Sequence, residues 1–196
     1  MSQLLQGAGH GSRVRRFLFD QFTDTSNVAL PSHSPIIGGT WTTGRGDWSI
    51  GTSGNEVAST GETGPNNVTL SGGQPNGNLS CDIFTGDTFT YAGLAVRRTS
   101  SNTFVAFFLR NGEDDVQIGF YNAGVFTALT TSALTISTGT TYAIRLRLDG
   151  TTIEAFVGGS TVASAATTFN QTASAHGLLT FDAQANVRWD NFIQDP

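Results

Sequence analysis

The chain has 196 residues, of which 38% are hydrophobic and only 13% charged, and its net charge is −5. This length and apolar content suffice for one domain with a buried core, and they argue against a disordered chain. The acidic balance argues against nucleic acid as a partner, because a protein that binds phosphates needs a basic face. No stretch is apolar for long enough to form a membrane helix, so we expect no membrane partner.

The first segment, residues 1–16, is rich in Gly, then basic, and has no sustained period. We expect it to form an arm that precedes a domain of residues 17–196. Two interpretations stay open: the arm orders on a partner surface, or it is a frayed terminus. The arm residues that would contact a partner are Leu4, Leu5, Arg13, Arg15 and Arg16. The arm lacks the regions of a secretion signal, so we expect synthesis in a cytoplasm without export by that route.

Short alternations of apolar and polar residues, separated by turn residues, follow to the end of the chain. No stretch has a helical period, so the pattern predicts an all-β, two-sheet antiparallel sandwich. The run Phe104–Arg110 is almost continuously apolar, which indicates a strand buried on both faces. We expect the first strand, Phe17–Phe22, to pair with the last, Val187–Ile193, and so to close the domain.

A hairpin is predicted between Thr141 and Val157, where two alternating runs flank Asp149-Gly150. This dipeptide favours a two-residue turn. With that turn, Leu146 faces Ile153, and Arg145 lies opposite Glu154 on the other face of the sheet. Elsewhere, the single cysteine, Cys81, lies in an apolar alternation, which indicates a small buried side chain.

Several short motifs resemble those of laminin-G-like, concanavalin-A-like jelly-roll proteins of bacteriophage virions. They are Phe19-Asp20-Gln21-Phe22-Thr23, His33-Ser34-Pro35, Gly38-Gly39-Thr40-Trp41 and Trp189-Asp190-Asn191-Phe192. The resemblance implies a jelly-roll fold over about residues 17–194. Its members serve as capsid decorations, tail components and glycan-binding modules, so the resemblance leaves the role open.

Enzymes of this fold class would be expected to cleave glycans with two carboxylates across the sugar. The pattern Glu-x-Asp-x-x-Glu of laminarinase-like members is missing from the sequence. The nearest acidic run, Glu113-Asp114-Asp115, lies at an expected hairpin turn, where a solvated loop is the simpler interpretation. We therefore expect that the protein is not an enzyme and has no catalytic residues.

Two kinds of ligand site remain as candidates. Trp48 and Tyr121 could offer flat apolar rings to a glycan, although Trp residues within apolar patterns also fill cores. Asp20, Asp24 and Asp190 could supply oxygen ligands to calcium if the first and last strands pair. The alternative is that Asp20 and Asp190 accept backbone hydrogen bonds at turns. Apart from this calcium, we expect no cofactor.

The leading hypothesis is a non-enzymatic bacteriophage virion protein, either a capsid decoration or cement protein or a tail component. It would act through contacts with other virion proteins, with the arm as anchor. We expect a homo-oligomer, with a trimer as the working assumption, located in the virion. The alternative is a glycan-binding module of a phage host-recognition structure, with a host-surface glycan as partner. A glycoside hydrolase-like enzyme is the more distant alternative.

Overall fold

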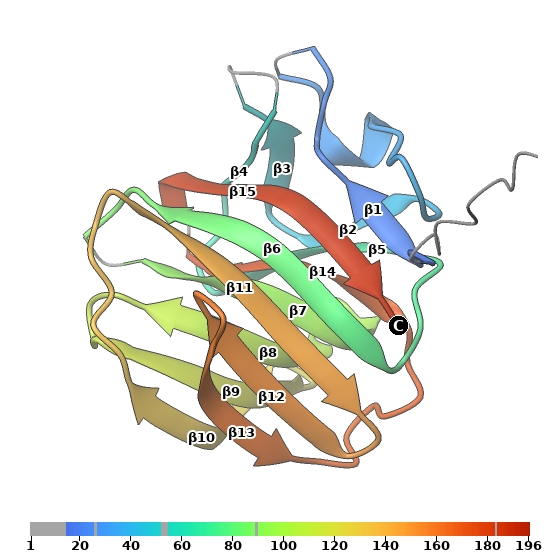
Figure 1. The fold of residues 1–196 in the computed structure, drawn as a ribbon. Helices are drawn as coiled ribbons and strands as arrows, with labels where there is room; N and C mark the ends of the chain where they lie inside the picture. The colour runs from blue at the N-terminus through green and yellow to red at the C-terminus, as the bar shows by residue number, and fades with distance from the viewer. Residues whose placement is uncertain (1–14, 26, 52–54, 89, 183) are drawn as a thin grey trace, which may run out of the picture.

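The computed structural model describes residues 15–25, 27–51, 55–88, 90–182 and 184–196. Two antiparallel sheets pack face to face as a β-sandwich, which confirms the predicted fold class (Figure 1). The only helical element among the described residues is a short 3₁₀ turn, η1 (Leu30–Ser32). In this part of the chain no helix is long and apolar enough to span a membrane.

The first sheet, here called sheet A, has eight strands. Seven follow one path, and β1 is added beside β15. In order they are β13 (Ser160–Ala166), β12 (Thr152–Val157), β11 (Thr140–Asp149), β6 (Gly77–Thr85), β15 (Gln184–Asp195), β4 (Val57–Thr60) and β3 (Asp47–Ile50), with β1 (Leu18–Asp20).

The second sheet, sheet B, has seven strands and carries the candidate site. In order they are β10 (Val125–Ala133), β9 (Asp115–Asn122), β8 (Thr103–Arg110), β7 (Tyr91–Ser100), β14 (Ala175–Phe181), β5 (Pro65–Leu70) and β2 (Trp41–Arg45). The predicted strand Phe104–Arg110 corresponds to β8, which belongs to the meander β7–β8–β9–β10.

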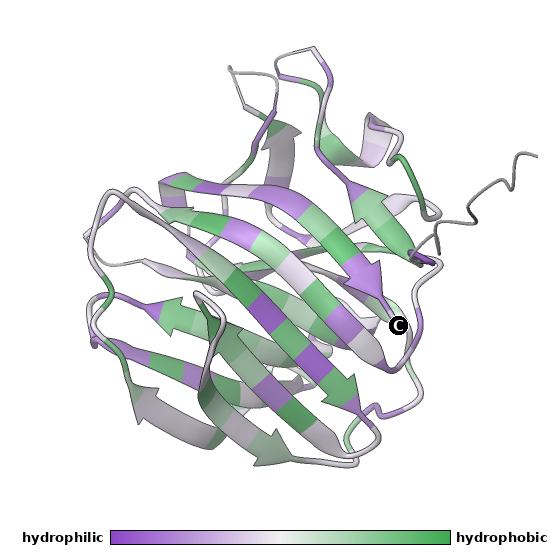
Figure 2. Cartoon of the chain, in the orientation of Figure 1, coloured by the Kyte–Doolittle hydropathy of each residue, from purple (hydrophilic) through white to green (hydrophobic). Residues whose placement is uncertain are grey.

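The main core lies between the sheets, because alternate residues of each strand point inward. Figure 2 shows this alternation of hydrophobic and hydrophilic residues along β6 and β11. Trp41 and Trp189 are fully buried in the core, where Trp189 packs on Trp48 and Trp41 packs on Phe192. Cys81 is also buried, and its thiol donates to the carbonyl oxygen of Asp190 at 3.2 Å.

The expected closure of the domain is confirmed. In the antiparallel pair β1–β15, Leu18 lies opposite Gln194 and Asp20 opposite Phe192. The two ends of the described chain therefore lie side by side (Figure 1). This pairing positions Asp20 next to the buried aromatic cluster of Trp41 and Phe192.

The hairpin β11–β12 forms where it was predicted, but its register differs. Leu148 lies opposite Ile153, Arg147 opposite Glu154, and Arg145 opposite Phe156. The turn residues are Gly150 and Thr151, and Gly150 takes a positive φ of 56°. Glycine at the first central position satisfies this conformation, so the turn begins one residue later than predicted. Each residue of β11 lies opposite a residue two positions further along β12 than predicted, so every side chain keeps its face of the sheet. The guanidinium of Arg145 lies over the Phe156 ring, 3.9 Å from the ring centroid.

Candidate functional site

The outer face of sheet B carries a second hydrophobic cluster, separate from the core. On β8, alternate residues such as Phe107 point to the core, while Phe104, Ala106 and Phe108 point outward. An outer sheet face that meets only water is normally polar. The continuous apolar run of β8 is explained by this second cluster, which confirms the prediction of a strand buried on both faces.

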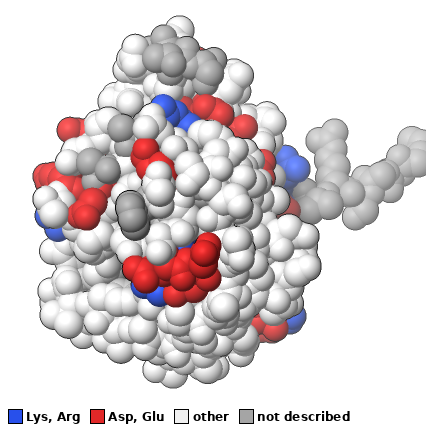
Figure 3. Space-filling view, turned by 90° about the vertical axis from the view of Figure 1, so that its left-hand side faces the viewer, with Lys and Arg blue, Asp and Glu red and all other residues white. Residues whose placement is uncertain are grey.

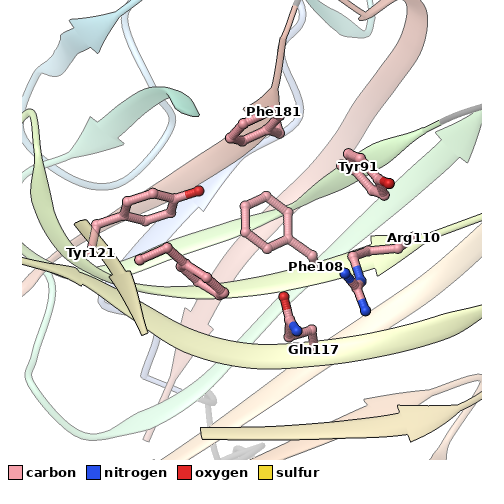
Figure 4. A pocket seen from close by; sticks show the side chains of 7 residues that line it. Tyr91, Phe108, Arg110, Gln117, Tyr121 and Phe181 are labelled. Atoms are coloured by element: carbon pink, nitrogen blue, oxygen red, sulfur yellow. The ribbon is translucent and has the colours of Figure 1, made fainter. Parts of the chain in front are cut away.

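A cleft of about 320 Å³ opens over this cluster. Its lining comes from strands β7, β8, β9, β10 and β14 and consists of Tyr91, Phe108, Arg110, Gln117, Tyr121, Phe126 and Phe181. Figure 4 shows Phe108 in the middle, with Tyr91, Tyr121 and Phe181 around it. Gln117, from β9, and Arg110, from β8, lie below the Phe108 ring in this view (Figure 4).

The rings of the cleft contact one another and hold their positions. The ring centroids of Tyr121 and Phe126 lie 4.9 Å apart. Phe108 and Phe126 pack edge to face, with their ring centroids 6.3 Å apart. Tyr91 and Phe181 form an edge-to-face pair at 6.2 Å. Such pairs add about 0.5–1.5 kcal/mol each beyond burial. Phe108 and Tyr121 are nearly buried, whereas the other three rings are half-buried, so they offer surface to a ligand.

Gly119 on β9 makes room for this arrangement. A Cβ at this position would lie 2.5 Å from the tip of the Phe126 ring and 2.6 Å from the Thr127 carbonyl oxygen. Only glycine therefore lets the Phe126 ring cross the neighbouring strand and reach Tyr121.

Polar groups at the edge of the rings can bind hydroxyl groups. Gln117 donates through Nε2 to Thr131 at 3.0 Å, which leaves its Oε1 as an acceptor. Arg110 binds Asp115 through Nε and Nη2, which leaves Nη1 as a donor. The Tyr121 hydroxyl has no hydrogen-bond partner among the residues that the structure describes. Burial raises the pKa of Tyr121 to about 12, so this hydroxyl keeps its proton at neutral pH.

The charge around the cleft is acidic. The β8–β9 turn carries Glu113 and Asp114, and Asp115, the first residue of β9, balances the charge of Arg110. Tyr91 donates its hydroxyl proton to Glu113 at 2.8 Å, and this hydrogen bond raises the pKa of Tyr91. Figure 3 shows a dense patch of acidic side chains beside a basic group on this side of the molecule. The cleft therefore suits a ligand without negative charge.

The two predicted glycan-binding residues have different places in the structure. Tyr121 lines the aromatic cleft. Trp48 is 3% exposed, donates its indole proton to the Arg45 carbonyl oxygen at 3.0 Å, and packs against Trp189 in the core with its ring tilted. It borders another cavity, of about 460 Å³, but it presents almost no ring surface there. The other rings of the cleft were missed, and the apolar run of β8 was the signal that could have indicated them.

The three predicted metal ligands do not come together. Asp20 and Asp24 meet at His33, where Asp20 accepts from Nε2 at 2.9 Å and Asp24 pairs with Nδ1 at 3.0 Å. Asp20 also accepts from the Trp41 indole at 2.7 Å. Asp190 lies opposite Asp82 across β6 and β15. Among the described residues, no group of three or more His, Cys, Asp or Glu side chains is arranged to hold a metal.

Only part of the predicted arm can be placed. Leu4, Leu5 and Arg13 lie outside the described residues. Arg16 lies on the domain's own surface. Its Nε is 3.8 Å from Oδ1 of Asp195, and its Cζ is 4.3 Å from the centroid of the Phe19 ring. Arg15 lies 5.6 Å from the ring of Phe17. These two side chains therefore contact the sandwich itself.

Known structures share this fold, a jelly-roll sandwich of the galectin-like and concanavalin-A-like kind. No protein-family model matches the sequence, and no curated protein matches it either. The carbohydrate-binding module CBM66 from Bacillus subtilis has 15% identity and a TM-score of 0.59, covering 79% of this chain and 91% of its own. The Bacillus licheniformis β-glucanase has 13% identity and a TM-score of 0.58, covering 87% and 97%. The galectin LEC-6 of Caenorhabditis elegans has 14% identity and a TM-score of 0.52, covering 72% and 95%.

These comparisons correct one expectation and leave another without support. The prediction that the protein is not an enzyme is wrong, because glycoside hydrolases share this fold. They include the β-glucanase and a Bacillus halodurans xylosidase. The phage virion origin and the laminin-G relation find no support among these structures. At such low identity the likeness shows the fold alone, so the site itself must carry any functional argument.

Proposed function

We propose that the protein binds carbohydrate in the aromatic cleft on the outer face of sheet B. The observation that carries this proposal is the convergence of five aromatic rings and three hydrogen-bonding groups around one cleft. A sugar ring has apolar C–H faces that pack on aromatic rings, and hydroxyl groups at its rim that need polar partners. Both requirements are met within the same lining.

The half-buried rings of Tyr91, Phe126 and Phe181 would contact the apolar face of a sugar. Gln117 Oε1 would accept a hydrogen bond from a hydroxyl group, and Arg110 Nη1 would donate one. The cleft volume is at the lower end for small-molecule sites, so it suits on the order of one or two sugar rings of a longer glycan.

The comparisons favour glycan binding over the virion structural role. The three structures reported above are described as a carbohydrate-binding module, a galectin and a glucanase. The virion role rests on short sequence motifs alone, and the Asp20, His33 and Trp41 of those motifs bind one another in the folded domain. Glycan binding is the alternative that the sequence left open.

A glycan array followed by calorimetry tests the proposal. We expect at least one uncharged glycan to bind, and Phe181→Ala to weaken binding by about tenfold, because one stacked ring is worth about 1 kcal/mol or more. The matched control is Phe156→Ala, a half-buried ring on the outer face of sheet A. Its affinity should equal that of the wild type. Absence of any bound glycan, or equal affinity of Phe181→Ala and wild type, would contradict the proposal.

A further inference from the structure

One side of the sandwich is free of charge. Strand β10 ends sheet B, strand β13 ends sheet A, and the two strands contact each other, so both edges lie on the same side (Figure 1). No Asp, Glu, Arg or Lys occurs from Val116 to Ile144, or from Ala155 to Phe181. In Figure 3 most of the lower end of the visible face, where β10 and β13 lie in Figure 1, is white, apart from a small group of charged side chains at the lower right.

Neither strand has a hydrogen-bonded neighbour on its outer side among the described strands. Each strand pairs on one side only, β10 with β9 and β13 with β12. No further strand of the described chain covers their outer edges. The two edges are nine and seven residues long, and Val125 at the start of β10 is 70% exposed. Unpaired amide and carbonyl groups on such an edge are a template for another strand.

Proteins usually protect such edges with charged residues or Pro. The opposite side of this sandwich is protected in that way. There β2 and β3 end the two sheets, β2 carries Arg45 and β3 carries Asp47. Arg45 also forms an ion pair with Glu62 at 2.7 Å. The side of β10 and β13 has neither charge nor Pro, so the two sides differ in the feature that controls pairing.

We propose that two copies of the chain associate along this uncharged side, with β10 pairing antiparallel to β10 of the second copy. A twofold axis perpendicular to the sheets lets β13 pair with its own copy at the same time, because β10 and β13 lie one over the other. Identical strands without charge bring no like charges together in such a pair. A charged partner would find no counter-charge on this side. The proposed twofold dimer differs from the trimer that we assumed from the sequence.

The dimer would also join the two aromatic clefts. Phe126, which lines the cleft, belongs to β10. Pairing through β10 makes one continuous sheet, with both clefts on the same face. The association itself needs no ligand, so it can be tested whether or not the cleft binds glycan.

Sedimentation equilibrium of the full chain, without ligand, tests the proposal. We expect a species of about twice the protomer mass of 20.6 kDa. Thr127→Lys on β10 should weaken the dimer by at least about tenfold, because it adds a positive charge to both copies of the paired strand. Ser164→Lys on β13 provides a second variant. Both replaced residues are exposed, so the fold should survive, which circular dichroism will verify.

The matched control is Thr43→Lys, an exposed threonine on β2 at the other edge of the same sheet. It should dimerise like the wild type. A monomer or a trimer at every concentration would overturn the proposal. So would a dimer that survives both Thr127→Lys and Ser164→Lys, or one that Thr43→Lys dissociates equally well.

Discussion

The ring of Phe126 lies across the backbone of Gly119, where a Cβ would come within 2.5 Å of the ring. Gly119→Ala should therefore displace Phe126 from the cleft. We expect a loss of about 1–3 kcal/mol in the free energy of unfolding, as for other overpacked sites. Weaker glycan binding should accompany it. Urea denaturation and calorimetry measure the two effects.

Gly51→Ala is a suitable control for this substitution. A Cβ at Gly51 meets its nearest neighbour, the Glu56 carbonyl oxygen, at an ordinary 3.4 Å, and no positive φ is required there. Its stability and affinity should stay close to those of the wild type. If Gly119→Ala has the same stability and affinity as Gly51→Ala, the position of the Phe126 ring does not require glycine at residue 119.

Tyr121→Phe removes a hydroxyl group and keeps the ring. This hydroxyl has no partner in the described structure, so its loss should leave the free energy of unfolding nearly unchanged. If it binds a sugar hydroxyl, affinity should fall by about 1 kcal/mol, or about fivefold. Calorimetry with the glycan found by the array gives the answer. Equal affinities would place the ligand away from Tyr121.

The buried His33 predicts a dependence of stability on pH. Burial lowers the pKa of the imidazole, but hydrogen bonds to Asp24 and Asp20, together with their charges, outweigh this and raise it above 6.5. Only the protonated ring donates to both carboxylates. Its contribution to stability is therefore complete below about pH 6.5 and is lost as the pH rises through the raised pKa of the folded state.

His33→Asn isolates this contribution. The difference in free energy of unfolding between wild type and variant should be larger at about pH 6 than at about pH 9. At the acid end, the hydrogen bond from His33 lowers the pKa of Asp24, so this carboxylate stabilises the fold above about pH 3.8 and ceases to do so below its folded pKa. A difference that is constant from about pH 6 to about pH 9 would refute the assignment.

His176 predicts an effect of the opposite sign. It is completely buried, its Nδ1 accepts from the Arg97 amide at 3.1 Å, and its Nε2 lies 2.7 Å from the Gln74 carbonyl oxygen. Burial lowers its pKa to about 4. The unfolded chain therefore binds a proton first, and stability should fall by up to about 3 kcal/mol as the pH drops from about 6.5 to about 4. His176→Asn should show a smaller fall over this range.

The sequence predicts the sandwich well because alternation along each strand is a local property. It also predicts the closure by β1 and β15, since both strands carry strong apolar patterns at the ends of the domain. The hairpin register was less accessible, because either Asp149-Gly150 or Gly150-Thr151 can form a two-residue turn, and both keep Leu146 and Leu148 on the core face.

The candidate site was only partly predictable. Tyr121 was selected from β9, but the cleft needs residues from five strands whose order in the sheet is not a local property. Phe181, for example, meets Tyr91 only because β14 pairs with β7. Trp48 shows the converse case: its sequence neighbours are polar, yet tertiary packing encloses it against Trp189.

The burial of Cys81 has a chemical consequence. Burial, the main cause, raises the pKa of this thiol well above its usual value, and the reactive thiolate is therefore not formed at neutral pH. The side chain is 2% exposed, so oxidants and other thiols have little access to it. Since it is the one cysteine of the chain, the folded protein should keep the same stability and binding in reducing and in oxidising surroundings.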